Sequence, residues 1–295
     1  MPRDTPMSPD PKPSLASLFT AQSDAYPDEG DVQGLPPTLA PIRRTERRGP
    51  VADLTGLGKA WMLIGSGGGG KTTLARWLGG ELAARGKADG TILAALDPAN
   101  RTLAHFFEAV MQPPSSDPAE TVAWLRNLLG FIAKQRGNAI LDFGGGDVSL
   151  ARLIESAPSI ADTMEAEGVA LIAAYVLTPR VDDLASLVTF EERGVRPRAT
   201  ALVLNLAKAE TPAAFDAVRR QTAYKAALAR GAVEVWMPAL EPQSLALRIE
   251  QGRMQFAAAR DGDERIAMIE GALVREFLDR MATEFRVVEG WLPWT

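Results

Sequence analysis

Residues 60–72 read AWMLIGSGGGGKT, an apolar run of strand length that leads into a glycine-rich loop. The loop has the spacing G-x-x-x-x-G-K-[ST], which is typical of a phosphate-binding loop when a strand precedes it and a helix follows. The apolar spacing of residues 72–85 predicts that helix. Five of the six positions from Gly65 to Gly70 are glycine, which is conformationally costly unless the exposed backbone has a use. We therefore predict a loop that binds phosphate rather than an ordinary turn.

The chemistry expected of this loop comes from its backbone and from two side chains. Consecutive N–H groups can turn inward around phosphate oxygens, and the positive end of the following helix adds to the field. Lys71 is expected to reach the β and γ phosphates of a nucleotide, and the Thr72 hydroxyl to ligate Mg²⁺. The glycines expected to contact the nucleotide are Gly67, Gly68, Gly69 and Gly70.

Two aspartates are candidates to act beside the loop, because each one ends an apolar run of strand length. Asp142 ends the run AILD, and the glycines at 144–146 follow it after one phenylalanine. We expect Asp142 to hold Mg²⁺ or the attacking water, and the glycine turn to sense a terminal phosphate as switch loops do. An ordinary turn with an exposed aspartate is the alternative. Asp97, which precedes a proline, could assist Mg²⁺ or water, or could cap a helix over residues 101–110.

Beyond the loop, strand-length apolar runs alternate with helix-length amphipathic segments. This alternation is typical of an α/β fold, a mostly parallel sheet covered by helices on both faces. The predicted strands are residues 60–64, 91–96, 139–142, 169–177, 200–205 and 233–237. The predicted helices are residues 72–85, 121–135, 182–192, 212–230, 242–251 and 264–285. In the last helix, Ile266, Ile269, Leu273, Phe277 and Met281 recur at helical spacing, which predicts core packing or a dimer contact.

The chain divides by composition near residue 50. Residues 1–50 hold ten of the 21 prolines and show no period of 2 or 3.6, so we predict a disordered arm followed by one folded domain over 51–295. Residues 15–19 could form a short helix that docks a protein partner, and arginines at 43, 44, 47 and 48 form a basic cluster. A solvated linker is the simpler interpretation of both segments.

Bulk composition excludes several other classes of protein. The 295 residues include no cysteine, so disulfides and thiolate metal sites are impossible. His105 is the one histidine, which excludes histidine-based triads and two-histidine zinc sites. The apolar runs are too short to span a membrane, and no signal peptide is recognisable, so we expect a cytoplasmic protein. The net charge of −5 argues against nonspecific nucleic-acid binding by the protein as a whole.

With these features in order, residues 60–250 resemble the ParA/MinD class of P-loop ATPases. Three segments have a counterpart in that class. They are the loop through Thr73, the sequence around Asp97, and the segment from Asp142 to the following glycines. The triplet ending at Asn205 resembles the strand whose asparagine contacts the purine base, and Pro238 resembles the proline that packs near that base. The resemblance implies a P-loop NTPase fold with ATP and Mg²⁺ as ligands. It also implies that Thr73, Asn205 and Pro238 belong to the nucleotide site.

One departure from that class concerns hydrolysis. Its members carry an early lysine in the loop that reaches the partner's nucleotide in a dimer, and Ser66 stands at that position here. A missing cation of this kind can lower the rate by roughly 10³ to 10⁵. Either hydrolysis is slow, or another residue supplies the charge. Arg180, Arg76 and Arg101 are the candidates.

The leading hypothesis is an ATP-binding switch that dimerises with nucleotide and serves plasmid partition, mobilisation or conjugative transfer. ATP is favoured over GTP because Asn205-Leu206-Ala207-Lys208 lacks the lysine and aspartate placement of GTPases. A small-molecule or nucleotide kinase, with residues 253–260 as its lid, and a noncatalytic nucleotide-binding adaptor are the alternatives. Residues 194–198, with Arg219, Arg220 and Lys225, could form a basic face for DNA.

Overall fold

The computed structural model describes residues 51–96, 102–145 and 148–295. In these residues seven strands form one sheet in the order β3-β2-β4-β1-β5-β6-β7, and all paired strands are parallel. The strands are β1 (Gly58–Ile64), β2 (Thr91–Ala95), β3 (Val110–Met111), β4 (Asn138–Asp142), β5 (Val169–Leu177), β6 (Ala199–Asn205) and β7 (Val233–Met237). The predicted α/β class is confirmed. The predicted arm at 1–50 lies outside the described residues, and the domain boundary at residue 50 stays a prediction.

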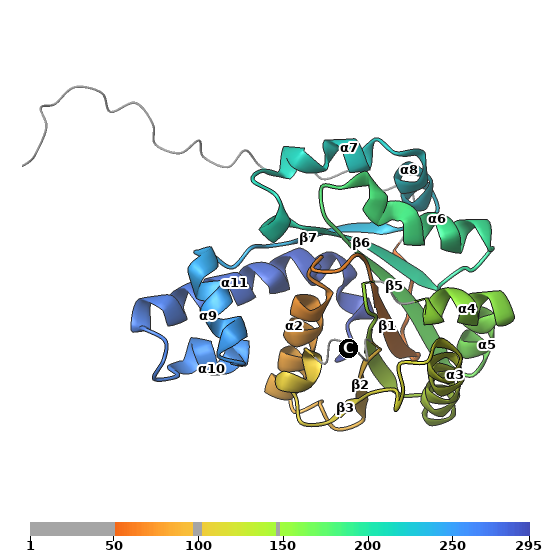
Figure 1. Ribbon diagram of the computed structural model, residues 1–295, viewed down its shortest axis with the longest axis horizontal. Coiled ribbons are helices and arrows are strands. Elements are labelled where there is room, and N and C mark those ends of the chain that lie inside the picture. The colour runs from red at the N-terminus through yellow and green to blue at the C-terminus, as the bar shows by residue number, and fades with distance from the viewer. Residues whose placement is uncertain (1–50, 97–101, 146–147) are drawn as a thin grey trace, which may run out of the picture. The chain divides into compact units, whose positions relative to one another are not determined.

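Helices lie on both faces of the sheet (Figure 1). On one face are α2 (Lys71–Ala84) and α11 (Met268–Phe285). Helices α9 (Gln243–Gln251) and α10 (Phe256–Asp261) lie beside them, and α10 contacts both. On the other are α3 (Pro118–Gln135), α4 (Ser149–Ser156), α5 (Ile160–Ala166) and α6 (Ala185–Glu192). The short helices α7 (Asp216–Arg219) and α8 (Thr222–Ala229) lie beside the β6–β7 edge. Short 3₁₀ helices occupy Leu103–His105, Val181–Leu184, Leu206–Lys208, Pro212–Phe215 and Arg286–Trp291.

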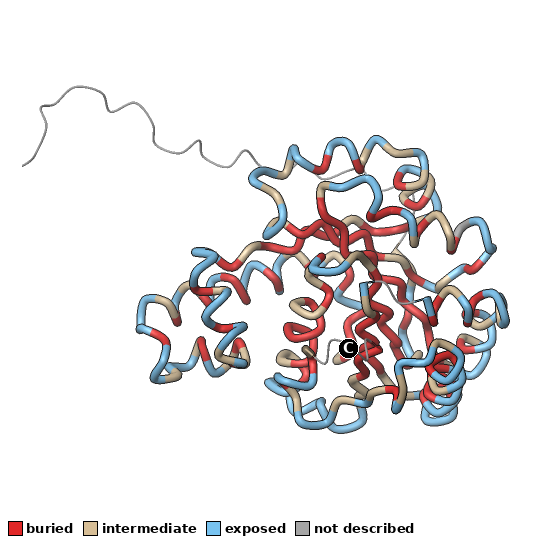
Figure 2. The backbone as a smooth tube through the Cα atoms, viewed as in Figure 1, coloured by how far each residue is buried: buried red, intermediate tan, exposed pale blue. Residues whose placement is uncertain are grey.

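The buried sheet explains why its strands were recognisable from apolar runs. A parallel sheet covered on both faces needs apolar side chains on both sides of each strand. All nine residues of β5 and all seven of β1 are buried, and Figure 2 shows this burial along the strands. In β1 the side chains alternate between faces, so that Trp61 and Leu63 join the core shared with α2 and α11.

Three predicted helices differ from the structure for local reasons. Helix α3 begins at Pro118, three residues early, because the Asp117 carboxylate accepts hydrogen bonds from the backbone N–H groups of Ala119 and Glu120. The predicted helix over 212–230 is broken into a 3₁₀ turn, α7 and α8, because Gln221 has extended backbone angles. The predicted helix over 182–192 begins with the 3₁₀ turn at 181–184.

Ile269 does not pack in the core, so the prediction of core packing is wrong at this residue, and a dimer contact there stays a prediction. Helix α11 begins at Met268 because Ala267 is extended, and its N–H donates to the carboxylate of Glu270. Ile266 therefore lies before the helix and is buried, whereas Ile269 is 70% exposed. The stripe continues correctly through Phe277 and Met281, which are both buried in the core.

The last residues of the chain pack against the start of the sheet. The Trp61 indole N–H donates to the carbonyl of Trp291 at 2.7 Å, and the Trp291 indole N–H donates to the carbonyl of Ala52 at 2.8 Å. Lys59, which is buried, donates to the carbonyl of Thr295, and burial lowers the pKa of Lys59. These contacts join β1, the end of the chain and the first described residues.

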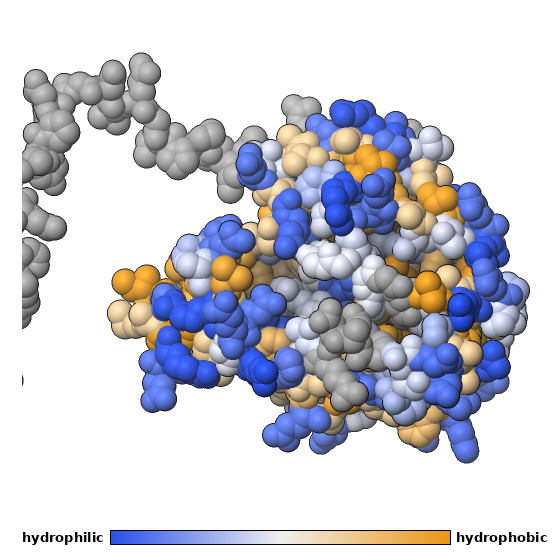
Figure 3. Space-filling model, in the orientation of Figure 1, coloured by the Kyte–Doolittle hydropathy of each residue, from blue (hydrophilic) through white to orange (hydrophobic). Residues whose placement is uncertain are grey.

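Apolar side chains gather at the tip formed by α9, α10 and the start of α11, visible in orange in Figure 3. Leu247, Met268 and Ile269 are exposed there. Among the helices of the described residues, none has the length and hydropathy needed to cross a membrane.

Candidate phosphate-binding site

The glycine loop lies between the carboxyl end of β1 and the first turn of α2, which is where the sequence predicts it. Gly65, Gly68 and Gly70 have φ values of 155°, 69° and 106°, a region that side chains other than glycine rarely adopt. A Cβ at Gly65 would lie 2.4 Å from the carbonyl oxygen of Val176 on β5. The glycines are therefore needed both for the turn and for its close packing on the neighbouring strand.

Lys71 begins α2 and folds back over the loop. Its ammonium donates to the carbonyl oxygens of Gly65 at 3.0 Å and Ser66 at 2.8 Å. The side chain is buried but lines the cavity described below. An ammonium held at this point can bind phosphate oxygens as a point charge.

Thr72 and Asp142 meet across the end of the loop. The Thr72 hydroxyl donates to the Asp142 carboxylate at 2.8 Å, although 70 residues separate them in sequence. Strand β4 pairs with β1, which places Asp142 opposite Leu63, two residues before the loop begins. A hydroxyl and a carboxylate are oxygen ligands of the kind that Mg²⁺ prefers, so the pair fits the predicted metal position.

The glycine turn that follows Asp142 lies directly against the loop. The backbone N–H of Phe143 donates to the carbonyl of Leu63 at 3.2 Å. A Cβ at Gly145 would lie 2.2 Å from the backbone nitrogen of Gly67. A side chain at Gly145 is therefore incompatible with this contact between the turn and the loop.

Asn205 and Pro238 lie on the other side of the loop. The Asn205 amide donates to the carbonyl of Gly69 at 2.7 Å, and its oxygen accepts from the N–H of Ala207 at 3.0 Å. In this structure the Asn205 side chain therefore supports the loop, and a Cβ at Gly70 would collide with it at 2.3 Å. Pro238 follows β7 and lines the same cavity as Asn205.

A cavity of about 530 Å³ connects these parts of the site. It is large enough for a nucleotide-sized ligand. The predicted site residues that line it are Gly67, Gly68, Gly70, Lys71, Thr72, Thr73, Asp142, Asn205 and Pro238. Gly69 is buried and does not line it, and its N–H and carbonyl bond within the protein. Asp97 lies outside the described residues. Apolar residues that the sequence did not predict for this site, among them Leu240, Phe256 and Phe277, also line the cavity.

Arg76 and Arg180, two of the three candidate cations, have different environments. Arg76 is buried, lies 3.7 Å from the ring centroid of Phe106 and 4.3 Å from that of Phe256, and donates to the carbonyl of Met254. Burial lowers the pKa of Arg76 to about 10, while the charge of Glu250 acts in the opposite direction. Arg76 thus holds helices together. Arg101 lies outside the described residues.

Arg180 lies beside the loop. It follows β5 by three residues, and its Nη2 donates to the Ser66 hydroxyl at 2.8 Å and to the Asp183 carboxylate at 3.1 Å. Burial by itself would raise the pKa of Asp183, but hydrogen bonds, chiefly from Thr178, and the charge of Arg180 hold that pKa below its ordinary value. Asp183 is therefore a carboxylate at neutral pH.

The basic residues considered for DNA are partly committed to acidic neighbours. Arg198 pairs with Glu165 at 3.1 Å, and Arg219 pairs with Glu234 at 3.0 Å. Residues 253–260, the candidate kinase lid, include most of α10, which packs on α11. His105 is exposed on its 3₁₀ turn.

Comparisons with known proteins leave the family open. No family model matches the sequence, and no curated protein matches it. Among solved structures, the fold is similar to the MinC:MinD cell division protein complex of Aquifex aeolicus, with a TM-score of 0.41 and 13% identity over 77% of this chain and 96% of that chain. At this level of similarity the comparison carries no conclusion about ligand, activity or partner.

Proposed function

We propose that this protein is a Mg²⁺-dependent ATP-binding switch of the ParA/MinD type that hydrolyses ATP slowly. The observation that carries the proposal is the 2.8 Å hydrogen bond between Thr72 and Asp142, at the end of a glycine loop that also holds Lys71. These groups come from two neighbouring strands and one helix start, and together they offer what a nucleoside triphosphate with Mg²⁺ requires. An ordinary glycine turn would need none of them.

Each group has a defined role in this proposal. The loop N–H groups and Lys71 bind phosphate oxygens, and Thr72 and Asp142 hold Mg²⁺, which would neutralise charge on the terminal phosphates. Asn205 and Pro238 border the part of the cavity proposed for the base, with Asn205 fixing the loop from that side. ATP is proposed over GTP because the segment after β6 lacks a GTPase base-recognition motif.

The biological role that we propose is partition, mobilisation or conjugative transfer of DNA, through a nucleotide-dependent homodimer. This step rests on the resemblance described for residues 60–250. A protein partner bound through residues 1–50 and a direct DNA contact belong to the same proposal.

Titration of the full chain with MgATP and MgGTP, together with sedimentation in each nucleotide, tests the proposal. Lys71→Ala should weaken MgATP binding by about 10- to 100-fold, because a charge-assisted hydrogen bond contributes about 1.5–3 kcal/mol. It should also abolish ATP-dependent dimerisation. Lys134→Ala, on the exposed face of α3, is the matched control and should bind like the wild type.

Two results would count against this function. Equal affinity for the two nucleotides, unchanged by Lys71→Ala, would show that the loop does not form the site. Tight ATP binding with no change in sedimentation would favour a kinase or a structural nucleotide binder over a switch.

A further inference from the structure

A chain of hydrogen bonds leads from the end of β5 to the phosphate-binding loop. The backbone N–H and the hydroxyl of Thr178 donate to one oxygen of Asp183, at 2.8 Å and 2.5 Å. The other Asp183 oxygen accepts from Arg180, and the same Arg180 nitrogen donates to the hydroxyl of Ser66. Four residues thus connect a buried strand end to the loop.

Burial along this chain is uneven. The Asp183 side chain is 2% exposed, whereas the Arg180 side chain is 63% exposed. The bonds that Arg180 makes with the described residues both come from Nη2. Its remaining N–H groups therefore face solvent at the edge of the loop, while a buried carboxylate fixes the guanidinium.

The bond to Ser66 places the Arg180 guanidinium beside the phosphate-binding loop. Ser66 directly precedes Gly67, whose backbone lines the cavity and contacts the Gly145 turn. A planar guanidinium presents N–H donors in a fork that matches phosphate oxygens. Lys71 is the first cation at the loop. Arg180, held on Ser66, would be a second cation beside a terminal phosphate bound there. Arg76 also lines the cavity, but its guanidinium packs against the rings of Phe106 and Phe256 and donates to the carbonyl of Met254.

We propose that Arg180 contacts the terminal phosphate of the bound nucleoside triphosphate and supplies the positive charge that Ser66 cannot. The proposal rests on the nucleotide-binding function proposed above, and in it Arg180 accounts for the slow turnover that remains without the early lysine. In the reaction, a water oxygen forms a bond to the terminal phosphorus, and the bond from that phosphorus to the bridging oxygen breaks. The electron pair of the broken bond stays on the departing diphosphate, and the proton of the water passes to solvent. Arg180 stabilises the charge on the phosphoryl oxygens during this exchange.

The test uses the full chain and the variants Arg180→Ala and Arg180→Lys. Three affinities are measured, for MgATP, for MgADP, and for MgADP with aluminium fluoride, which mimics the phosphoryl group in transfer, and turnover is measured beside them. Arg180→Ala should keep its MgADP affinity within about twofold, lose the tightening caused by aluminium fluoride, and lower turnover by about 10³-fold or more. Arg180→Lys should recover part of both losses, because it keeps the charge without the fork.

Arg193→Ala is the matched control, since Arg193 is, like Arg180, an exposed arginine paired with a carboxylate, that of Glu155, on a different part of the surface. It should behave like the wild type. Thermal unfolding followed by circular dichroism confirms that each variant folds.

Different failures have different meanings. If Arg180→Ala binds MgADP with aluminium fluoride as tightly as the wild type, Arg180 does not contact the transferring phosphate. If the wild type binds MgADP but aluminium fluoride adds nothing, the inference falls while nucleotide binding stands. If the wild type binds no nucleotide, the proposed function falls and takes the inference with it.

Discussion

Gly145 lies where any side chain would collide with the phosphate-binding loop. The nearest atom to a Cβ at this position would be the backbone nitrogen of Gly67 at 2.2 Å, and the next its Cα at 2.3 Å. Backbone atoms cannot yield as the end of a flexible side chain can. The turn and the loop must therefore separate if residue 145 gains a methyl group.

We expect Gly145→Ala to weaken MgATP binding by at least about tenfold, and to destabilise the fold by about 1–3 kcal/mol through the local displacement. Isothermal titration and urea unfolding measure the two effects. Gly130→Ala, in an open position on α3, should leave binding unchanged and raise stability by up to about 1 kcal/mol. Unchanged MgATP binding by Gly145→Ala would mean that the contact between this turn and the loop does not affect nucleotide binding.

At this level, the residues that could be predicted from sequence are those carried by local motifs. Lys71 and Thr72 belong to one short pattern, and Asp142 ends an apolar run, so local spacing was enough to predict that all three lie around the loop. The contact between Arg180 and Ser66 spans 114 residues, and the contact between Asn205 and Gly69 spans 136. Contacts of this kind depend on which strands become neighbours, which no local pattern specifies.

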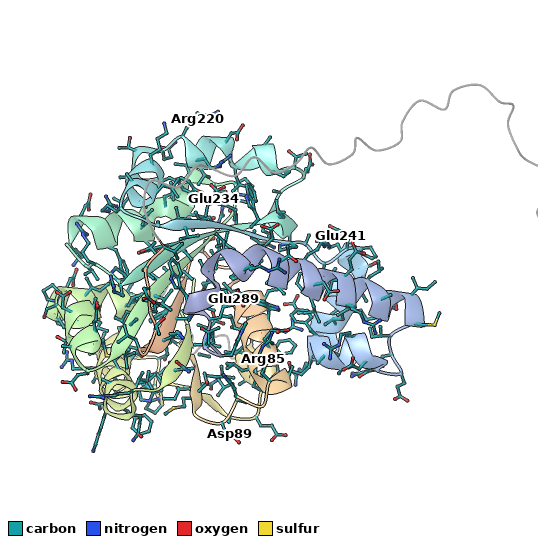
Figure 4. All side chains as sticks on the ribbon, turned by 180° about the vertical axis from the view of Figure 1, so that it is seen from behind. Arg85, Asp89, Arg220, Glu234, Glu241 and Glu289 are labelled. Carbon is teal, nitrogen blue, oxygen red and sulfur yellow. The ribbon has the colours of Figure 1, made fainter. Side chains whose placement is uncertain are left out.

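Strand β7 and helix α8 meet through a buried polar cluster. The Tyr224 hydroxyl donates to the Glu234 carboxylate at 2.5 Å, and Arg219 pairs with the same oxygen. Figure 4 labels Glu234, seen from behind the view of Figure 1. Burial first, and then the charge of Glu234 and the hydrogen bond to it, raise the pKa of Tyr224 above its ordinary value.

This shift predicts a loss of stability at alkaline pH. Above about pH 10, the unfolded chain releases the Tyr224 proton, whereas the folded protein retains it. The folded state then binds more protons, so the free energy of unfolding should fall by about 1.4 kcal/mol per pH unit from this residue. Tyr224→Phe should remove that part of the decline. Urea unfolding between about pH 9 and pH 11 measures it, with Tyr26→Phe in the predicted arm as control. Equal slopes for Tyr224→Phe and the wild type would refute the coupling.

The helices and strands were predictable to the extent that burial gave them a continuous apolar signal. The ranges of β5 and β7 match the predicted strands. Helices α4, α5 and α10 have six to eight residues, too short for a clear period, and β3 has only two. The break between α7 and α8 depends on the backbone of Gln221, a residue type that gives no stop signal.

The contact that joins the two ends of the folded unit lies within residues 44–295. The chain divides into two units, residues 1–43 and residues 44–295. The second unit includes both Ala52 and Trp291, which are joined by a hydrogen bond. We expect a chain that begins at residue 44 to keep the unfolding midpoint and the MgATP affinity of the full chain. Thermal melts and titration measure these. A lower midpoint would show that the first 43 residues belong to the fold.

Trp291→Phe provides the contrasting case in the same unit. It keeps most of the buried ring but removes the hydrogen bond to Ala52, so the free energy of unfolding should fall by about 1 kcal/mol or slightly more. Urea unfolding of Trp291→Phe and of the wild type measures the difference. A change of zero would mean that this bond does not contribute to closing the fold.

The same two indole hydrogen bonds have a mechanical consequence. Tension applied to the chain ahead of Ala52 would reach β1 through the backbone of residues 53–57, and it would also load the hydrogen bonds that join Ala52, Trp291 and Trp61. Because β1 lies between two parallel neighbours, its backbone hydrogen bonds would be sheared together rather than peeled one at a time. The phosphate-binding loop lies at the far end of that strand. Pulling on the N-terminus with optical tweezers should then give one high-force rupture, with the loop kept in shape until it occurs.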